Sequence, residues 1–246
     1  MNPTQRTAIV TGANGGIGKA AVRRLLKDGA NVVMAGHHQD RLDAAAAEIG
    51  KDFDPARILT VSCDVGNEDQ VKATVDAAFE HFGGWHIMVN NAGLMAFKPF
   101  EETTFDDWSA VLNVDLMGAF FFTKQAFLRM QPGGAVVNVS SVHAVATEAL
   151  VAPYAAAKTA LLSLTRSASI EGRPKGIRTN VILPGAIDTP MLWDNPNVKS
   201  GAEKIDKADV GEPDDIAAAI AFLVSDEAKF VCGAELRVDG GRLDRL

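Results

Sequence analysis

Short apolar runs alternate with longer amphipathic segments from one end of the chain to the other. The apolar runs lie at residues 7–12, 31–36, 57–64, 85–93, 135–141, 178–185 and 234–241. Apolar residues at helical spacing fill most of the intervals between them, at residues 18–29, 40–50, 68–83, 106–130 and 154–171. Strands that are apolar on both faces and alternate with helices are typical of a parallel sheet covered on both sides. Because such crossovers are nearly always right-handed, the pattern predicts an α/β fold with a doubly wound parallel sheet.

The pattern predicts a single domain spanning residues 1–246. With 47% apolar and 22% charged residues, the chain can bury one large core, and it shows neither a repeat nor an interdomain linker. The least regular stretch is residues 190–211, which precede a helix over 216–224 opened by Pro213. A long irregular segment in a compact domain is more often functional than a mere connector. We therefore expect a substrate lid at 190–211, with a plain connector as the alternative.

Charge and cysteine content narrow the class of protein. The net charge of -7, carried by scattered acidic residues, argues against a nucleic-acid partner. The two cysteines, Cys63 and Cys232, have no metal-ligand spacing and favour a reducing compartment, and the five histidines form no cluster, so we expect no metal. No long apolar run precedes the first strand, so the sequence predicts neither a signal peptide nor a membrane span. We expect a soluble, cytoplasmic protein.

A glycine-rich turn joins the first predicted strand to the first predicted helix. It reads TGANGGIG at residues 11–18, and its glycines permit a tight turn in which the backbone approaches a pyrophosphate at the helix N-terminus. Two later strands end in Asp64-Val65 and in Asn90-Asn91-Ala92-Gly93. Ligands of open parallel sheets gather at the carboxyl ends of the strands, so this turn predicts a dinucleotide site.

A tyrosine and a lysine four residues apart provide the candidate chemistry. Tyr154 and Lys158 share one helical face, where an ammonium beside a phenol is expected to lower the phenol pKa from its ordinary value of about 10. Ser141, thirteen residues upstream, offers a hydroxyl that can hold an oxygen whose proton the tyrosine gives or takes. The neighbouring Ser140 is expected to point to the opposite face of the strand.

Taken together, these motifs resemble the short-chain dehydrogenase/reductase superfamily, in its single-domain branch. The resemblance covers nearly the whole chain and rests on TGANGGIG, CDV, NNAG, Ser141 with YAAAK, NVILPGAIDTPM and FLVSDEAKFVCGAELRVDGG. It implies a Rossmann-like fold and reversible hydride transfer between a nicotinamide and a carbonyl or secondary alcohol. Tyr154 is then the general acid and base, with Lys158 and Ser141 beside it. The implied cofactor residues are Gly12, Asn14, Gly16, Ile17, Gly18, His37, Asp64, Val65, Asn91, Ala92, Gly93, Tyr154, Lys158, Pro184, Gly185, Ile187 and Thr189.

The sequence leaves the choice between NADP and NAD open and favours NADP. In similar NAD-selective proteins an acid usually stands in place of Gly36 and repels a 2′-phosphate, and no acid is present here. The places where NADP-selective relatives often carry a base hold Gly15 and His37, and a histidine is only partly charged at neutral pH. Arg41, from the next helix, is a further candidate, although a solvated surface arginine is the alternative.

One position departs from the family pattern. Similar proteins usually carry an asparagine seven residues after a tryptophan and three before a glycine, which completes a catalytic tetrad. Counted from Trp108 and Gly118, that place is Asp115, and Asn113 lies over half a helical turn away. Either the substitution is tolerated because the backbone carbonyl makes the relevant contact, or the carboxylate stabilises the charge of Lys158 and alters the pH profile.

The substrate is not determined by the sequence. A mostly apolar pocket is expected from Leu94, Met95, His143, Val145, Leu150, Val151, Met191, Leu192 and Trp193. A 3-oxoacyl-carrier reductase is one alternative, with Arg129, Arg173 and Lys175 meeting an acidic carrier protein, and a non-catalytic dinucleotide-binding sensor is another. Apolar residues around more than one side of the helices at 120–122 and 154–171 predict subunit packing, and the resemblance implies a homotetramer.

Overall fold

Seven parallel strands form the centre of the computed structural model, which describes residues 6–244. They are β1 (Thr7–Thr11), β2 (Asn31–Gly36), β3 (Ile58–Ser62), β4 (Ile87–Asn90), β5 (Ala135–Val139), β6 (Arg178–Pro184) and β7 (Glu235–Val238), in the order β3-β2-β1-β4-β5-β6-β7. The chain builds outward from β1 in one direction and returns to build outward from β4 in the other. This reversal creates a crevice at the carboxyl ends of β1 and β4, where α/β sheets bind their ligands.

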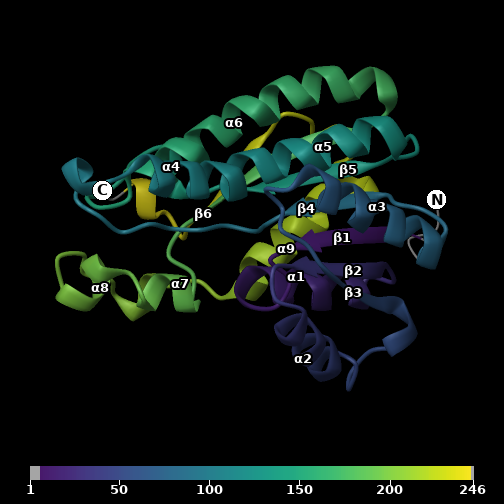
Figure 1. Cartoon of the computed structure of the whole chain (residues 1–246), viewed down its shortest axis with the longest axis horizontal. Helices are drawn as coiled ribbons and strands as arrows, with labels where there is room; N and C mark the ends of the chain where they lie inside the picture. Colours follow the sequence, from purple (N-terminus) through teal and green to yellow (C-terminus); the bar gives the residue numbers. More distant parts are fainter. Residues whose placement is uncertain (1–5, 245–246) are drawn as a thin grey trace.

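Helices cover both faces of the sheet, as the sequence predicts (Figure 1). One face carries α1 (Gly16–Lys27), α2 (Gln39–Ile49) and α9 (Pro213–Val224). The other carries α3 (Glu68–Phe82), α4 (Phe105–Leu112), α5 (Gly118–Arg129) and α6 (Ala152–Gly172). The single helix predicted over 106–130 is in fact α4 and α5 joined by a π-helical turn at Asn113–Met117.

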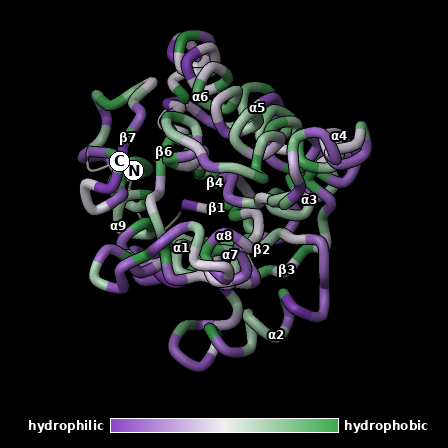
Figure 2. Tube along the Cα trace, turned by 90° about the vertical axis from the view of Figure 1, so that its left-hand side faces the viewer, coloured by the Kyte–Doolittle hydropathy of each residue, from purple (hydrophilic) through white to green (hydrophobic). Residues whose placement is uncertain are grey.

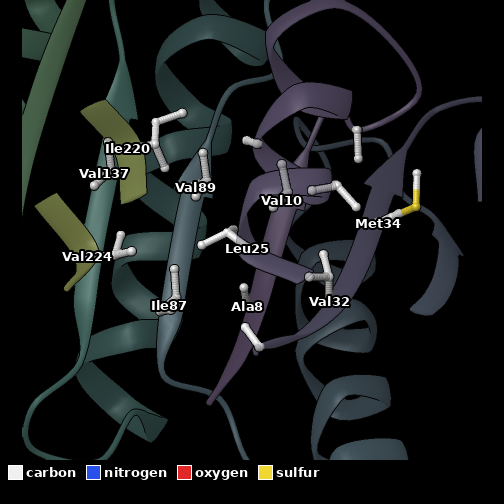
Figure 3. Packing of buried hydrophobic residues seen from close by; sticks show 14 of the residues in the cluster. Ala8, Val10, Leu25, Val32, Met34, Ile87, Val89, Val137, Ile220 and Val224 are labelled. Atoms are coloured by element: carbon white, nitrogen blue, oxygen red, sulfur yellow. The ribbon is translucent and has the colours of Figure 1, made fainter. Parts of the chain in front are cut away.

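Alternation along each strand divides the core into two layers. Ala8 and Val10 of β1 pack with Leu25 of α1 and Ile220 of α9, whereas Ile9 points to the opposite layer (Figure 3). Successive residues of a strand point to opposite faces, so a wholly apolar strand supplies both layers at once. The uninterrupted apolar runs of the sequence therefore have their physical cause in a sheet that is buried on both sides.

The segment at residues 190–211 is more regular than predicted. It contains two short helices, α7 (Pro190–Trp193) and α8 (Pro196–Ser200), which lie in front of the sheet in Figure 2. A proline opens each helix, where its missing N–H costs nothing, and the Asn195 side chain accepts a hydrogen bond from the Asn197 N–H. Local capping of this kind cannot be recognised from hydrophobic periodicity.

No helix within residues 6–244 is long and apolar enough to span a bilayer.

Candidate active site

The glycine-rich turn is shaped by one very close backbone approach. Gly12 has φ +63°, a conformation that favours glycine, and a Cβ on Gly18 would lie 2.1 Å from the Gly12 carbonyl oxygen. The turn delivers the chain to the start of α1, whose N-cap residue Gly15 makes no side-chain capping bond. The first N–H groups and the positive end of the helix dipole are therefore free to meet an anion.

A cavity of about 460 Å³ opens beside this turn, at the carboxyl ends of the strands. Its walls bring together most of the predicted residues: Gly12, Asn14, Gly16, Ile17, Asn91, Ala92, Gly93, Ser141, Tyr154, Lys158, Pro184, Gly185, Ile187 and Thr189. Arg41, named from the sequence as a candidate for selecting NADP, is also on the wall, and so is Asn195, which the sequence did not indicate. Hydrophobic periodicity could not indicate Asn195, because this residue is the N-cap of the short helix α8 in an irregular segment.

Four predicted cofactor residues do not line this cavity. Gly18 is buried behind the turn, and His37 is exposed with its ring 4.9 Å from that of His38. The Asp64 side chain accepts a hydrogen bond from the Gly66 N–H. Val65 faces a separate, smaller cavity. Of the two basic side chains named from the sequence for NADP selection, Arg41 lines the cavity and His37 does not.

Tyr154 and Lys158 lie on the inner side of α6, and Ser141 follows the end of β5. All three side chains are buried, with residue exposures of 6%, 3% and 7% respectively. Ser140 also lines the cavity, and its hydroxyl donates to the Lys158 carbonyl at 2.9 Å. This hydrogen bond joins the end of β5 to the backbone of α6, and the neighbouring Ser141 hydroxyl hydrogen-bonds to Tyr154.

The pKa of Tyr154 is raised, opposite to the direction expected from the sequence. Burial is the largest cause, and the Asp115 carboxylate adds to it, while Lys158 and a hydrogen bond from Ser141 oppose it. The expectation about Lys158 was thus right in sign, but it omitted the cost of burying a phenolate.

Asp115 projects from the π-helical turn directly onto Lys158. Its Oδ2 lies 3.1 Å from Lys158 Nζ, and its Oδ1 accepts a hydrogen bond of 2.7 Å from the Leu94 N–H. Burial raises the pKa of Asp115, whereas the pKa of Lys158 is raised by Asp115 and Tyr154 against the lowering effect of burial. The raised pKa of Asp115 favours a neutral carboxyl, whereas the raised pKa of Lys158 favours a charged ammonium. We assign the ionised pair, because Lys158 Nζ lies at ion-pair distance from Oδ2 and the Leu94 N–H donates to Oδ1, although Oδ2 itself accepts no hydrogen bond.

The apolar pocket is only partly as expected. Met95, His143, Met191 and Leu192 line the cavity, and the His143 ring centroid lies 5.9 Å from that of Tyr154. The other expected pocket residues do not line it, namely Leu94, Val145, Leu150, Val151 and Trp193. Val151 is core, because it is fully buried beside Val111. Within residues 6–244, no group of three or more His, Cys, Asp or Glu side chains is placed to hold a metal ion.

Comparison with known proteins identifies the family. Residues 12–242 match the family model described as enoyl-(acyl carrier protein) reductase. A curated relative, 3beta-hydroxysteroid dehydrogenase 1 of Eggerthella lenta, is 37% identical over 243 residues, covering 96% of this chain and 93% of the relative. The chain belongs to the short-chain dehydrogenase/reductase superfamily. Glucose 1-dehydrogenase 2 of Bacillus subtilis is 36% identical to this dehydrogenase over 245 residues, covering 97% and 95%.

Solved relatives agree in fold and in the class of cofactor. A short-chain dehydrogenase from Burkholderia cenocepacia in complex with NADP has a TM-score of 0.89 and 32% identity, with 98% of each chain covered. Other solved relatives are complexed with NADPH or NADH. This short-chain dehydrogenase is therefore an oxidoreductase that uses NADP or NAD and transfers a hydride between the nicotinamide and a carbonyl or alcohol.

The site in this dehydrogenase fits such a cofactor. The cavity volume of about 460 Å³ lies in the usual range for small-molecule sites, roughly 300–1,000 Å³. The tight turn at Gly12 and Gly18 and the uncapped N-terminus of α1 provide the close backbone approach that a pyrophosphate requires.

We predict that Gly18→Ala weakens NADPH binding by about tenfold or more, equivalent to roughly 1.4 kcal/mol. The added Cβ, 2.1 Å from the Gly12 carbonyl oxygen, must push apart two backbone segments of the turn. The wild-type protein is the reference, because Gly15, where a Cβ would meet nothing within 4 Å, itself lines the cavity. Titration calorimetry with NADPH measures both proteins. Equal affinities of Gly18→Ala and the wild type would contradict this role for the turn.

Proposed function

We propose that this dehydrogenase interconverts a carbonyl and a secondary alcohol with Tyr154 as general acid and base, Ser141 holding the substrate oxygen and Lys158 beside the phenol. The observation that carries the proposal is the meeting of these three buried side chains on one wall of the dinucleotide cavity. Tyr154 and Lys158 lie one turn apart on α6, whereas Ser141 follows β5, so the fold brings the serine to the pair. A non-catalytic sensor has no need of it.

Proton movement is the task of the protein side chains. When bound, the reduced cofactor supplies a hydride to the carbonyl carbon, and the oxidised cofactor takes it back in the reverse reaction. In reduction the Tyr154 O–H bond breaks and its proton goes to the substrate oxygen, which becomes the alcohol hydroxyl. The resulting phenolate recovers a proton from solvent. Ser141 orients the substrate oxygen, and Lys158 stabilises the phenolate while it exists.

Tyr154→Phe is expected to lower kcat by about 10²–10⁴-fold, because it removes the transferable proton and little volume. The dissociation constant for NADPH should stay within a few-fold, which calorimetry checks. Turnover is followed at the absorbance of the reduced nicotinamide, with a panel of ketones, sugars, diols and acyl thioesters. Full activity of this variant would overturn the assignment of Tyr154.

NADP is the cofactor that we propose this chain prefers, with Arg41 as the side chain that selects it. Arg41 lies on the cavity wall near the start of α2, and it has no hydrogen bond or ion pair among the described residues. The nearby Asp43 is engaged by Gln39 and Thr60 instead. Gly36 presents no carboxylate that would repel a 2′-phosphate. A free guanidinium at this place suits that phosphate.

For Arg41→Ala we expect kcat/KM with NADPH to fall by about 10- to 100-fold, the usual value of a hydrogen-bonded charge. The value with NADH should hardly change. His37→Ala is the control, because His37 is a neighbouring base that stands off the cavity wall. A wild-type enzyme that strongly prefers NADH, or an equal loss with both cofactors, would refute the selection by Arg41.

A modest, partly apolar carbonyl or alcohol is the substrate class that the cavity supports. The basic residues that would meet a carrier protein give no support to the more specific 3-oxoacyl-carrier reductase. Arg129 is paired with Asp76 at 2.5 Å and lies over the Phe79 ring. Arg173 and Lys175 precede β6, so they are at the amino ends of the strands, opposite the cavity.

Residues 190–211 are proposed as the substrate lid. Met191 and Leu192 of α7 face the cavity, which gives the segment contact with a bound substrate. Asn195 donates a 2.7 Å hydrogen bond to Glu148, and Asn197 donates one of 3.0 Å to the Ala149 carbonyl. These contacts connect the segment to the loop before α6. Closure of the lid would then move this loop, which leads into α6 close to Tyr154.

A homotetramer in the cytoplasm is the proposed working state. The free cysteines, Cys63 and Cys232, suit a reducing compartment. For assembly, β7 is an edge strand, and close to it Phe230 is 98% exposed and Phe222 43% exposed. An edge strand beside exposed aromatic side chains favours a covering subunit.

The assembly proposal predicts a mass in light scattering of four times that of one chain. Phe230→Asp should lower this mass, because a buried carboxylate at a subunit contact is costly. Circular dichroism checks that the fold is retained. A monomeric mass for the wild-type protein would contradict the tetramer.

A further inference from the structure

The carboxylate of Asp115 is held where it acts on Lys158. Its side chain is fully buried in the π-helical turn, 3.1 Å from Lys158 Nζ. The Leu94 N–H fixes its other oxygen at 2.7 Å, and Lys158 Nζ also donates to the Val139 carbonyl at 3.1 Å. Both side chains are therefore restrained from more than one direction. A π-helical turn inside a longer helix is often found at a functional site, and here it carries the carboxylate.

The main chain packs closely over this pair. A Cβ on Gly93 would lie 3.3 Å from Asp115 Oδ2 and 3.5 Å from Lys158 Nζ. The segment that lines the dinucleotide cavity thus shields the pair from that side. In such surroundings each charge affects its neighbours more strongly than it would in water.

The identity of the side chain matters because an asparagine here would be neutral. An amide oxygen could also accept the Leu94 N–H bond, but it could not balance the ammonium. With the carboxylate, Lys158 and Asp115 together carry no net charge, and Tyr154 faces a neutral pair where a lone cation would otherwise be.

We propose that Asp115 is a positioning residue that neutralises Lys158 and thereby keeps the Tyr154 phenol protonated, ready to donate its proton in carbonyl reduction. This inference rests on the proposed function, because it concerns the same proton. Asp115 acts through Lys158 and has no place among the groups that touch the substrate.

Other titratable groups leave this balance unchanged. Three titratable side chains lie near Tyr154: Lys158 on the same helix, Asp115 in the π-helical turn and His143 in the turn after β5. Burial lowers the pKa of His143, so its ring is neutral at neutral pH and adds no charge. The hydroxyl of Ser141 supplies a hydrogen bond without titrating. The carboxylate is therefore the group whose removal changes the charge around the phenol.

Removal of the Asp115 carboxylate is expected to shift the pH dependence of both reaction directions. Asp115 raises the pKa of Tyr154, so its removal lowers that pKa. Reduction needs the protonated phenol and fails as the pH rises through the pKa; oxidation needs the phenolate and gains over the same range. Both limbs should move to lower pH in Asp115→Asn. A charge at about 4–6 Å shifts a pKa by roughly 1–3 units, and Asp115 acts from behind Lys158, so we expect about one pH unit.

The chain offers a direct test, because Tyr154 is its only tyrosine. Tyrosinate absorbance in the near ultraviolet therefore titrates this one residue without any substrate. The titration is carried out on the wild-type protein, on Asp115→Asn and on Asp106→Asn, each saturated with oxidised NADP. Asp106→Asn is the matched control, since it removes one exposed carboxylate from the neighbouring helix α4. Circular dichroism confirms that the fold persists over the pH range.

We expect the titration midpoint of Asp115→Asn to lie about one pH unit below that of the wild type, and that of Asp106→Asn to be unchanged. The falling limb of kcat/KM for carbonyl reduction should shift by the same amount. An unchanged or higher midpoint in Asp115→Asn would overturn the inference and leave the proposed function intact. The proposed function fails separately, if Tyr154→Phe keeps full turnover.

Discussion

A single buried ammonium, that of Lys158, connects the parts of the chain that form the active site. It contacts the Val139 carbonyl at the end of β5, the Asp115 carboxylate in the π-helical turn and the Tyr154 ring on its own helix, whose centroid is 5.4 Å away. Burying one charge costs several kcal/mol unless partners compensate it. The positions of β5, of the turn between α4 and α5 and of α6 are thus coupled by one electrostatic requirement.

The same requirement explains why a carboxylate is acceptable in a site of proton transfer. An unpaired Asp115 would be as costly as an unpaired Lys158, so the two side chains stabilise each other. The Leu94 N–H, which belongs to the segment lining the dinucleotide cavity, completes the arrangement. Cofactor site and proton-transfer site therefore share one polar cluster. A change in that segment is expected to reach Tyr154 even where it contacts neither substrate nor phenol.

Most of the fold could be predicted from the sequence, because both sides of the sheet are buried and each strand appears as an unbroken apolar run. The glycine turn and the Tyr154–Lys158 pair could also be predicted, since the geometry of each depends on neighbouring residues in the sequence. The π-helical turn could not be predicted, because an inserted residue changes the helical register without changing the composition. Arg41 and His37 compete for one function on either side of a helix start, and only the three-dimensional arrangement separates them. The pKa of Tyr154 depends on burial, which spacing alone does not measure.

We have assigned Tyr154 as the group whose proton moves in the reaction. Two pKa values, measured in the wild-type protein saturated with oxidised NADP, decide this assignment. One comes from tyrosinate absorbance, which reports Tyr154 alone, and the other from the rising limb of kcat/KM for alcohol oxidation. If Tyr154 is that group, the two pKa values agree within about half a pH unit. A kinetic pKa well separated from the spectroscopic one would show that another group carries the proton.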